Sequence, residues 1–193
     1  MIAPSVSSAP CRRTWLYDCG VHLRVAGREE LAALEALMDA AIGELQTPFL
    51  DDRQIAASRA IMGLDTQLVE DGTYFVVESN GELAGCGGWS RRATLYGGDR
   101  TPGRSPTLLN PETDAARIRA MYTHPRHARK GIARLILSTC EDAARREGFR
   151  RVELMSTLSG EPLYLACGYQ PLERLTDTRG GAPVPLVRMG KPL

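Results

Sequence analysis

Apolar and polar residues along the chain follow two periods, one typical of helices and one typical of strands. Helical spacing covers residues 28–45, a shorter segment over 51–62, and a stretch from Ile132 to Arg146 that stops just before Gly148. A further short helix is expected over 161–166. Alternating, β-branched or aromatic runs predict strands over residues 21–26, 73–78, 82–89, 117–123, 151–156, 169–175 and 184–189. This order predicts a single α/β alternation without an internal repeat.

The segment of residues 90–114 interrupts this alternation. It contains several Gly and Pro residues and shows neither period. Loops of this length are uncommon inside a compact domain, and many of those that occur are functional. We therefore interpret the segment as a long surface loop and suspect that it has a function.

The helix that begins near Ile132 lacks the usual signals of a helix start. No Ser, Thr, Asp or Asn occupies the capping position, so the first backbone N–H groups have no side-chain acceptor. Arg126, Arg129 and Lys130 add positive charge to the positive end of the helix dipole, a mismatch of roughly 0.3–1 kcal/mol per charge. A phosphate would relieve both problems, and Gly131, without a Cβ, would let it approach the backbone. The alternative is an ordinary surface loop with solvated arginines.

A predicted strand over residues 117–123 runs directly into this turn and ends before Pro125. A strand, a phosphate-ready turn and a helix together form a nucleotide-binding arrangement. Two common versions are excluded. The P-loop needs GxxxxGK followed by Ser or Thr, which does not occur, and the dinucleotide fingerprint GxGxxG is matched here only at Gly131.

The stretch THPRHARKGIARLIL resembles the acetyl-CoA motif of the Gcn5-related N-acetyltransferase (GNAT) family. That motif has Gln or Arg, two further residues, Gly, one residue, and then Gly or Ala at the head of a helix. Gly131 and Ala133 match it, whereas Ala128 stands at the Gln or Arg position and Arg129 at the glycine that usually follows. A second stretch, LSGEPLYLACGYQPLER, resembles the family's C-terminal motif through Tyr164 and the Gly168-Tyr169 pair. The resemblance implies a twisted mixed sheet, mostly antiparallel, with helices on both faces.

The resemblance also implies roles for individual residues. Tyr164 is expected to donate a proton to the departing thiol, although a core tyrosine is the alternative. The backbone of Met121, Tyr122 and Thr123 would hold the pantetheine arm of acetyl-CoA. The pyrophosphate would be held by Ala128, Arg129, Lys130, Gly131, Ile132 and Ala133. Thr157 stands where the family often has an Asn that touches the cofactor.

The residues leave the base and the acceptor site open. Glu153 and Asp114 are the candidates for the base, beside a water relay, and either carboxylate is also readily explained as a solvated surface group. His124 and His127 are expected at the surface beside the phosphate loop. Trp89 and Tyr96 are candidates for the acceptor pocket, with a core position as the alternative for Trp89.

The amino-acid composition indicates which binding partners and which cellular compartment to expect. The chain has 193 residues, 43% hydrophobic and 24% charged, and a net charge of +1 that argues against nucleic-acid or membrane binding. Five cysteines without CxxC spacing indicate free thiols in the cytoplasm and no metal site. No stretch reaches the ~18 apolar residues of a membrane span. We expect a flexible leader over residues 1–19 and an N-acetyltransferase domain over 20–193, as a monomer or homodimer.

These observations lead to one hypothesis and two alternatives. The hypothesis is an acetyl-CoA-dependent N-acetyltransferase that acts on a primary amine of a small molecule or peptide by direct transfer in a ternary complex. The first alternative is a non-catalytic acyl-CoA-binding sensor. The second is a transferase that uses another acyl-CoA or a hydroxyl acceptor.

Overall fold

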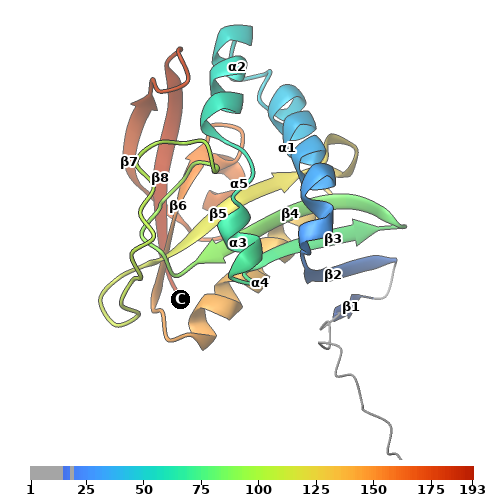
Figure 1. Ribbon diagram of the computed structural model, residues 1–193, viewed down its shortest axis with the longest axis vertical. Coiled ribbons are helices and arrows are strands. Elements are labelled where there is room, and N and C mark those ends of the chain that lie inside the picture. The colour runs from blue at the N-terminus through green and yellow to red at the C-terminus, as the bar shows by residue number, and fades with distance from the viewer. Residues whose placement is uncertain (1–14, 18–19) are drawn as a thin grey trace, which may run out of the picture.

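The computed structural model describes residues 15–17 and 20–193. The leader expected over residues 1–19 therefore lies outside the described residues, except for strand β1 (Trp15–Tyr17), which pairs with the strand that follows it. Within the described part, one sheet runs through the whole molecule (Figure 1).

The sheet has eight strands in the order β1-β2-β3-β4-β5-β6-β8-β7. All neighbouring strands are antiparallel except β5 and β6, which are parallel. The strands after β1 are β2 (Val21–Val25), β3 (Tyr74–Ser79), β4 (Glu82–Ser90), β5 (Ala116–Thr123), β6 (Arg151–Thr157), β7 (Gln170–Asp177) and β8 (Val184–Pro192). The expected mixed, mostly antiparallel sheet is confirmed.

Helices cover both faces of this sheet, as expected (Figure 1). One face carries α1 (Leu31–Leu45), which follows the 3-10 turn η1 (Arg28–Glu30), together with α2 (Asp52–Ile61) and α3 (Thr66–Glu70). The other face carries α4 (Ile132–Arg146) and α5 (Glu161–Ala166), and the 3-10 turn η2 (Pro125–His127) leads into α4. The sequence did not predict β1 or α3.

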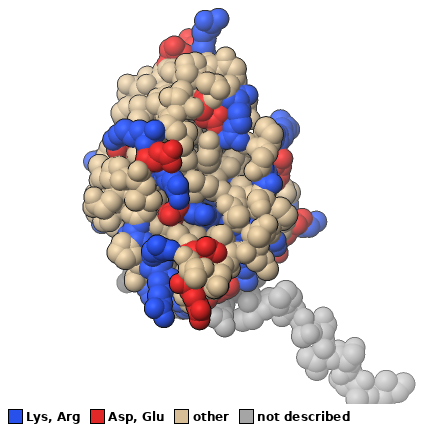
Figure 2. All heavy atoms as spheres, turned by 90° about the vertical axis from the view of Figure 1, so that its left-hand side faces the viewer, with Lys and Arg blue, Asp and Glu red and all other residues tan. Residues whose placement is uncertain are grey.

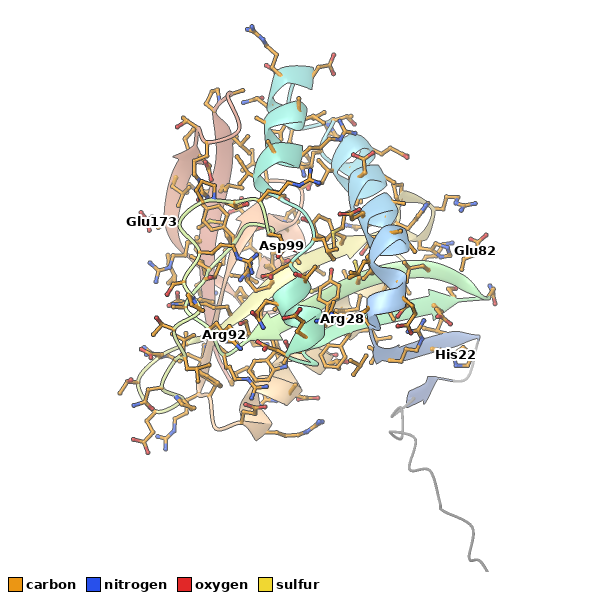
Figure 3. All side chains as sticks on the ribbon, in the orientation of Figure 1. His22, Arg28, Glu82, Arg92, Asp99 and Glu173 are labelled. Carbon is orange, nitrogen blue, oxygen red and sulfur yellow. The ribbon has the colours of Figure 1, made fainter. Side chains whose placement is uncertain are left out.

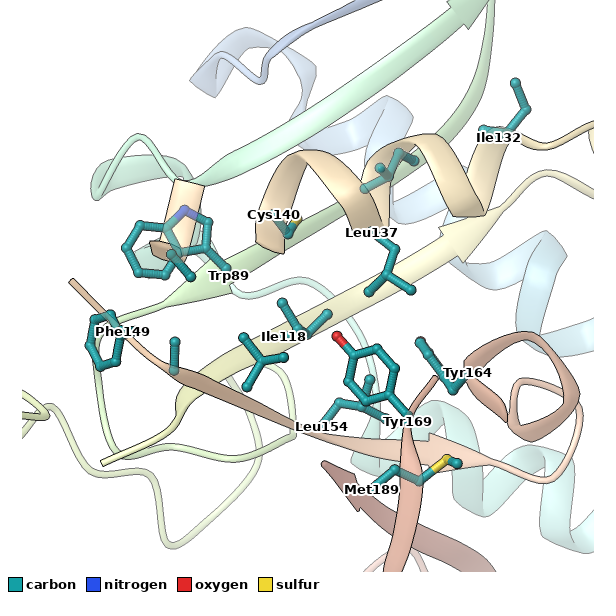
Figure 4. Packing of buried hydrophobic residues seen from close by; sticks show 14 of the residues in the cluster. Trp89, Ile118, Ile132, Leu137, Cys140, Phe149, Leu154, Tyr164, Tyr169 and Met189 are labelled. Atoms are coloured by element: carbon teal, nitrogen blue, oxygen red, sulfur yellow. The ribbon is translucent and has the colours of Figure 1, made fainter. Parts of the chain in front are cut away.

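The two long helices α1 and α4 are held by the apolar stripes that their spacing predicts. In α4, Ile136, Leu137 and Cys140 are buried in the largest apolar cluster, against residues of β3 to β6 and β8 (Figure 4). A fully buried Ile or Leu side chain contributes about 1.5–3 kcal/mol. On the opposite face α1 packs Leu34, Leu37 and Met38 against residues of β3, β4 and β5. The two clusters fix helices on both sides of β4 and β5.

The loop over residues 90–114 is fastened to the sheet by ion pairs. Arg119 of β5 donates hydrogen bonds to the carbonyl oxygens of Thr94 (2.8 Å) and Gly97 (2.6 Å) and to Asp65 Oδ2 (2.8 Å). Arg104 of the loop also pairs with Asp65, and with Asp99 at 2.6 Å. Figure 3 labels Asp99. The loop therefore forms a fixed wall beside β5.

Acidic and basic side chains are interspersed on the face that carries β7, β8 and this loop (Figure 2). One example is Arg179, which pairs with Asp177 and also donates to the carbonyl oxygen of Pro102 at 2.9 Å. Charges on this face are thus largely matched locally, in line with the net charge of +1.

Candidate functional site

The sheet opens between its two parallel strands. β5 and β6 pair only at Ala116 with Val152 and at Arg117 with Glu153, near the start of each strand. Farther along, β5 carries a bulge against β4, where Ala120 has a φ of +49°. A bulge bends its strand and interrupts pairing. The bend turns the second half of β5 away from β6 and leaves an opening through the sheet.

The turn after β5 presents a row of unbonded backbone N–H groups, which we call the cradle (residues 129–134). The first helical bond of α4 runs from the Leu135 N–H to the Gly131 carbonyl oxygen at 3.0 Å. None of the six N–H groups from 129 to 134 has an acceptor within the described part of the chain. Gly131 caps the helix with a φ of +83° and no side-chain bond, as its sequence predicted. A Cβ built there meets nothing within 4 Å, so the backbone is open to a ligand.

The side chains around the cradle are basic and lack partners. Arg129, Lys130 and Arg134 are exposed, and none forms an ion pair with a described residue. Arg126 is 3.7 Å from Glu82 at the start of β4, a pair that is open to solvent. Unpaired cations and open N–H groups at one helix start form an anion site.

A cavity of about 790 Å³ runs from the cradle through the opening between β5 and β6. Its α4 side is lined by the cradle and by Pro162, Leu163 and Tyr164 of α5. On the α1 side it is lined by Ile42, Leu45, Phe49 and the 95–97 part of the loop. Nine of the ten expected cofactor residues line it; Lys130 does not.

Tyr164 faces this cavity from α5. Its side chain is buried and its ring meets that of Tyr169 edge-on, with centroids 5.7 Å apart (Figure 4). Burial raises the pKa of the Tyr164 hydroxyl above its usual range. The group therefore stays protonated at neutral pH. A neutral hydroxyl at a cavity wall is placed to donate a proton.

Comparison with protein families identifies the chain. Residues 34–169, well over half of it, match the model of the acetyltransferase (GNAT) family. The protein is a member of the GNAT family. Comparison with curated proteins gives no significant match.

Solved structures with the same fold include several GNAT proteins. One is a GCN5-related N-acetyltransferase from Rhodopseudomonas palustris (18% identity, 99% of this chain and 100% of that one, TM-score 0.64). A second is yncA, a putative acetyltransferase from Salmonella typhimurium with acetyl-CoA (18% identity, 90% and 94% covered, TM-score 0.60). A third is the PaiA N-acetyltransferase from Thermoplasma acidophilum with coenzyme A (12% identity, 90% and 99% covered, TM-score 0.61). At 12–18% sequence identity, this structural similarity shows that the chain has the same fold as these proteins and shows nothing further.

Within this GNAT domain, the two carboxylates expected as bases do not reach the cavity. Glu153 Oε2 accepts from Arg117 at 2.6 Å and from Arg188 at 2.7 Å. Asp114 Oδ2 accepts the Asn110 N–H at 2.7 Å in the loop. Both carboxylates have structural partners, which accounts for their positions.

The two histidines of the motif differ in position. His124 accepts the Arg126 N–H at 3.2 Å, so it caps η2. The expectation of a surface position is wrong for His127, which is only 7% exposed and lines the cavity. Its Nε2 lies 3.4 Å from Glu82 Oε2. Glu82 stands at the tip of the β3–β4 hairpin (Figure 3). The contact of η2 with this hairpin buries the ring, and a motif of consecutive residues does not reveal such a contact.

The remaining candidates divide between core and cavity. Trp89 is buried against Phe149, with ring centroids 6.0 Å apart, which confirms the core interpretation. Tyr96 lines the cavity. Thr157 also lines it, and its Oγ1 accepts the Gly160 N–H at 3.2 Å.

On the α1 side of the cavity, Tyr96 was the one lining residue that the sequence indicated; the apolar residues of α1 and of the turns around α2 were not expected there. Phe49, 47% exposed in the turn between α1 and α2, was the most visible signal of this side, because a large apolar residue is unusual in a polar turn.

Other kinds of site find little support in the described chain. None of its helices is long and apolar enough to cross a membrane. Its His, Cys, Asp and Glu side chains nowhere form a group of three that could hold a metal ion.

Proposed function

We propose that this GNAT protein transfers an acetyl group from acetyl-CoA to a primary amine of a small molecule or peptide, with both substrates bound at once. The observation that carries the proposal is the single cavity that joins the cradle to the α1 side through the opened sheet. A donor on one side and an acceptor on the other can meet there without a covalent enzyme intermediate. The described cysteines Cys86 and Cys140 are buried core thiols, and Cys167 is half-buried; none of the three lines the cavity.

The residues at the cradle fit acetyl-CoA. Open N–H groups of residues 129–134 would accept the pyrophosphate, with Arg129 and Arg134 adding charge. Met121, Tyr122 and Thr123 lie where β5 is paired with β4 but not with β6, so backbone groups on the β6 side would bond the pantetheine arm along the opening. Ala128 supplies no side-chain contact to phosphate, so backbone groups have to provide most of the cradle. When bound, acetyl-CoA supplies a thioester, the activated acetyl group.

The chemistry assigned to the chain is proton transfer and polarisation. The amine nitrogen bonds to the thioester carbonyl carbon, and the carbon–sulfur bond breaks. The sulfur takes the proton of the Tyr164 hydroxyl, the nitrogen loses a proton to water, and the Tyr164 phenolate regains one from solvent. An N–H of β5 would polarise the carbonyl in the manner of an oxyanion hole. The products are an acetamide and free CoA thiol.

Thiol release from acetyl-CoA with a panel of amines tests the proposal. Turnover with at least one amine is expected, and Tyr164→Phe should lower it while CoA still binds. If CoA binds by calorimetry and no amine releases thiol, the non-catalytic sensor is the correct interpretation. If a longer acyl-CoA turns over faster than acetyl-CoA, the donor assignment is wrong.

We also propose that the protein acts in the cytoplasm.

A further inference from the structure

The α1 side of the cavity has an apolar surface. We define the acceptor wall as Ile42, Leu45, Phe49, Met62, Leu95 and Tyr96, which come from α1, the turns on either side of α2, and the 90–114 loop. Every one of these side chains is aliphatic, aromatic or a thioether. The wall lies across the opened sheet from Tyr164, where an acceptor has to bind if the proposed acetyl transfer is correct.

Three polar groups near the wall, from Arg119, Tyr96 and Gln46, already have partners. All three hydrogen bonds of the Arg119 guanidinium go to Asp65, Thr94 and Gly97, and its side chain is 2% exposed. The Tyr96 hydroxyl donates to Asp177 Oδ2 at 2.9 Å. Gln46 Oε1 accepts from the Ser58 hydroxyl at 3.1 Å. The wall therefore offers an acceptor molecule few free hydrogen-bonding groups.

The cavity also lacks a countercharge for a charged acceptor. Among the described residues that line it, none is Asp or Glu, so a second ammonium group would have no partner. On the α1 side the only cation is Arg119, which Asp65 already neutralises at 2.8 Å, so a carboxylate would have no partner either. Burying an unpaired charge costs several kcal/mol.

We propose that the acceptor is a small primary amine whose only ionisable group is the reacting nitrogen and whose body is apolar, either aromatic or branched aliphatic. This inference rests on the proposed acetyl transfer. It excludes polyamines, aminoglycosides and free amino acids as good substrates. Apolar side chains that line a concave site favour such a ligand through the area that it buries, about 25 cal/mol per Å².

The acceptor wall is rigid on both sides of Tyr96, so the pocket is already formed. Arg119 holds the loop backbone at Thr94 and Gly97. The guanidinium of Arg179 lies 4.9 Å from the centre of the Tyr96 ring and pairs with Asp177, which accepts the Tyr96 hydroxyl. A wall fastened in this way selects acceptors by shape and polarity without first having to order a mobile loop.

The test compares amines that differ only in the body: 2-phenylethylamine, isoamylamine, putrescine and phenylalanine. The expected kcat/KM for either apolar amine exceeds that for putrescine and for phenylalanine by at least about 100-fold. This factor follows because burying the second, unpaired charge of putrescine or phenylalanine costs several kcal/mol. Equal or better turnover of putrescine or phenylalanine would overturn the inference and leave acetyl transfer intact.

A substitution in the acceptor wall tests whether these residues contact the acceptor. Leu95→Asp places a carboxylate on the wall and should shift the kcat/KM ratio of putrescine to 2-phenylethylamine upward by at least about tenfold. Leu108→Asp is the matched control, because Leu108 lies in the same loop, is 62% exposed and does not line the cavity. An unchanged ratio in Leu95→Asp would contradict the assignment of the wall.

If no amine turns over, acetyl transfer itself fails and the wall is tested by binding instead. Calorimetric titration of 2-phenylethylamine and putrescine into the protein with saturating CoA then decides the matter. Preferential binding of 2-phenylethylamine supports an apolar pocket, and equal or preferential binding of putrescine refutes it.

Discussion

Replacing Gly131 by glutamate tests the cradle directly, because the change adds a negative charge where an anion is expected. Gly131 has a φ of +83°, and a Cβ there meets nothing within 4 Å, so the folded chain has room for the new side chain. A non-glycine residue in this left-handed region costs about 1–2 kcal/mol. The variant should therefore fold with a modest loss of stability.

The effect on CoA binding follows from the charge. Two like charges about 4 Å apart repel by about 1 kcal/mol in bulk water and about 4 kcal/mol at an effective dielectric constant near 20. Gly131 is exposed, so screening keeps the penalty toward the lower part of this interval. Since about 1.4 kcal/mol corresponds to tenfold in affinity, a penalty of at least about 1 kcal/mol makes binding at least about fivefold weaker.

Isothermal titration with CoA measures this loss, and urea unfolding checks the fold. Gly181→Glu is the control, because Gly181 has a φ of +92°, meets nothing within 4 Å and lies in the turn between β7 and β8, away from the cavity. It should lose similar stability and bind CoA like the wild type. A folded Gly131→Glu protein whose CoA affinity stays within twofold of the wild type would refute the cradle.

Three further predictions concern the acid, the base and an ion pair. Tyr164→Phe should lower kcat by roughly 10²–10⁴ in the thiol-release assay and leave the Kd for CoA unchanged; a loss below threefold would remove the acid role. No described carboxylate lines the cavity, so kcat/KM should rise with pH toward the pKa of the acceptor amine itself. Because burial raises the pKa of Tyr164, kcat/KM should fall only above the ordinary tyrosine pKa near ~10. An inflection that stays fixed when the amine is changed would indicate a base on the enzyme. Hydrogen bonds from Arg92 lower the pKa of Asp71, so this carboxylate stabilises the fold above about pH 4 and less as the pH falls through its folded pKa. Urea unfolding of Asp71→Asn should accordingly show a deficit at neutral pH that shrinks in acid, and a deficit independent of pH would contradict this.

The cradle could be predicted from the sequence because its signals are local. The missing cap, Gly131 and the apolar stripe from Ile132 onward all lie within a few turns of one helix, and the helix forms where they indicate. The family resemblance added Met121, Tyr122 and Thr123, and these three residues line the cavity. Short elements escaped prediction. α3 spans only Thr66–Glu70, too few residues to show a period.

Apart from Tyr96, the acceptor wall could not be predicted, because it depends on contacts between distant segments. Arg119 lies on a correctly predicted strand, yet its partners Asp65 and Gly97 stand 54 and 22 residues away. His127 is buried by a hairpin whose Glu82 lies 45 residues earlier. Periodicity shows which face of an element is apolar, and it does not show which loop will cover that face.

A crystal structure of the complex with CoA tests the central claim most directly. The account predicts pyrophosphate oxygens within hydrogen-bonding distance of the backbone N–H groups of residues 129–134, with the pantetheine arm between β5 and β6 and its sulfur beside the Tyr164 hydroxyl. A diphosphate bound elsewhere, or a cradle that stays empty at saturating CoA, would contradict it.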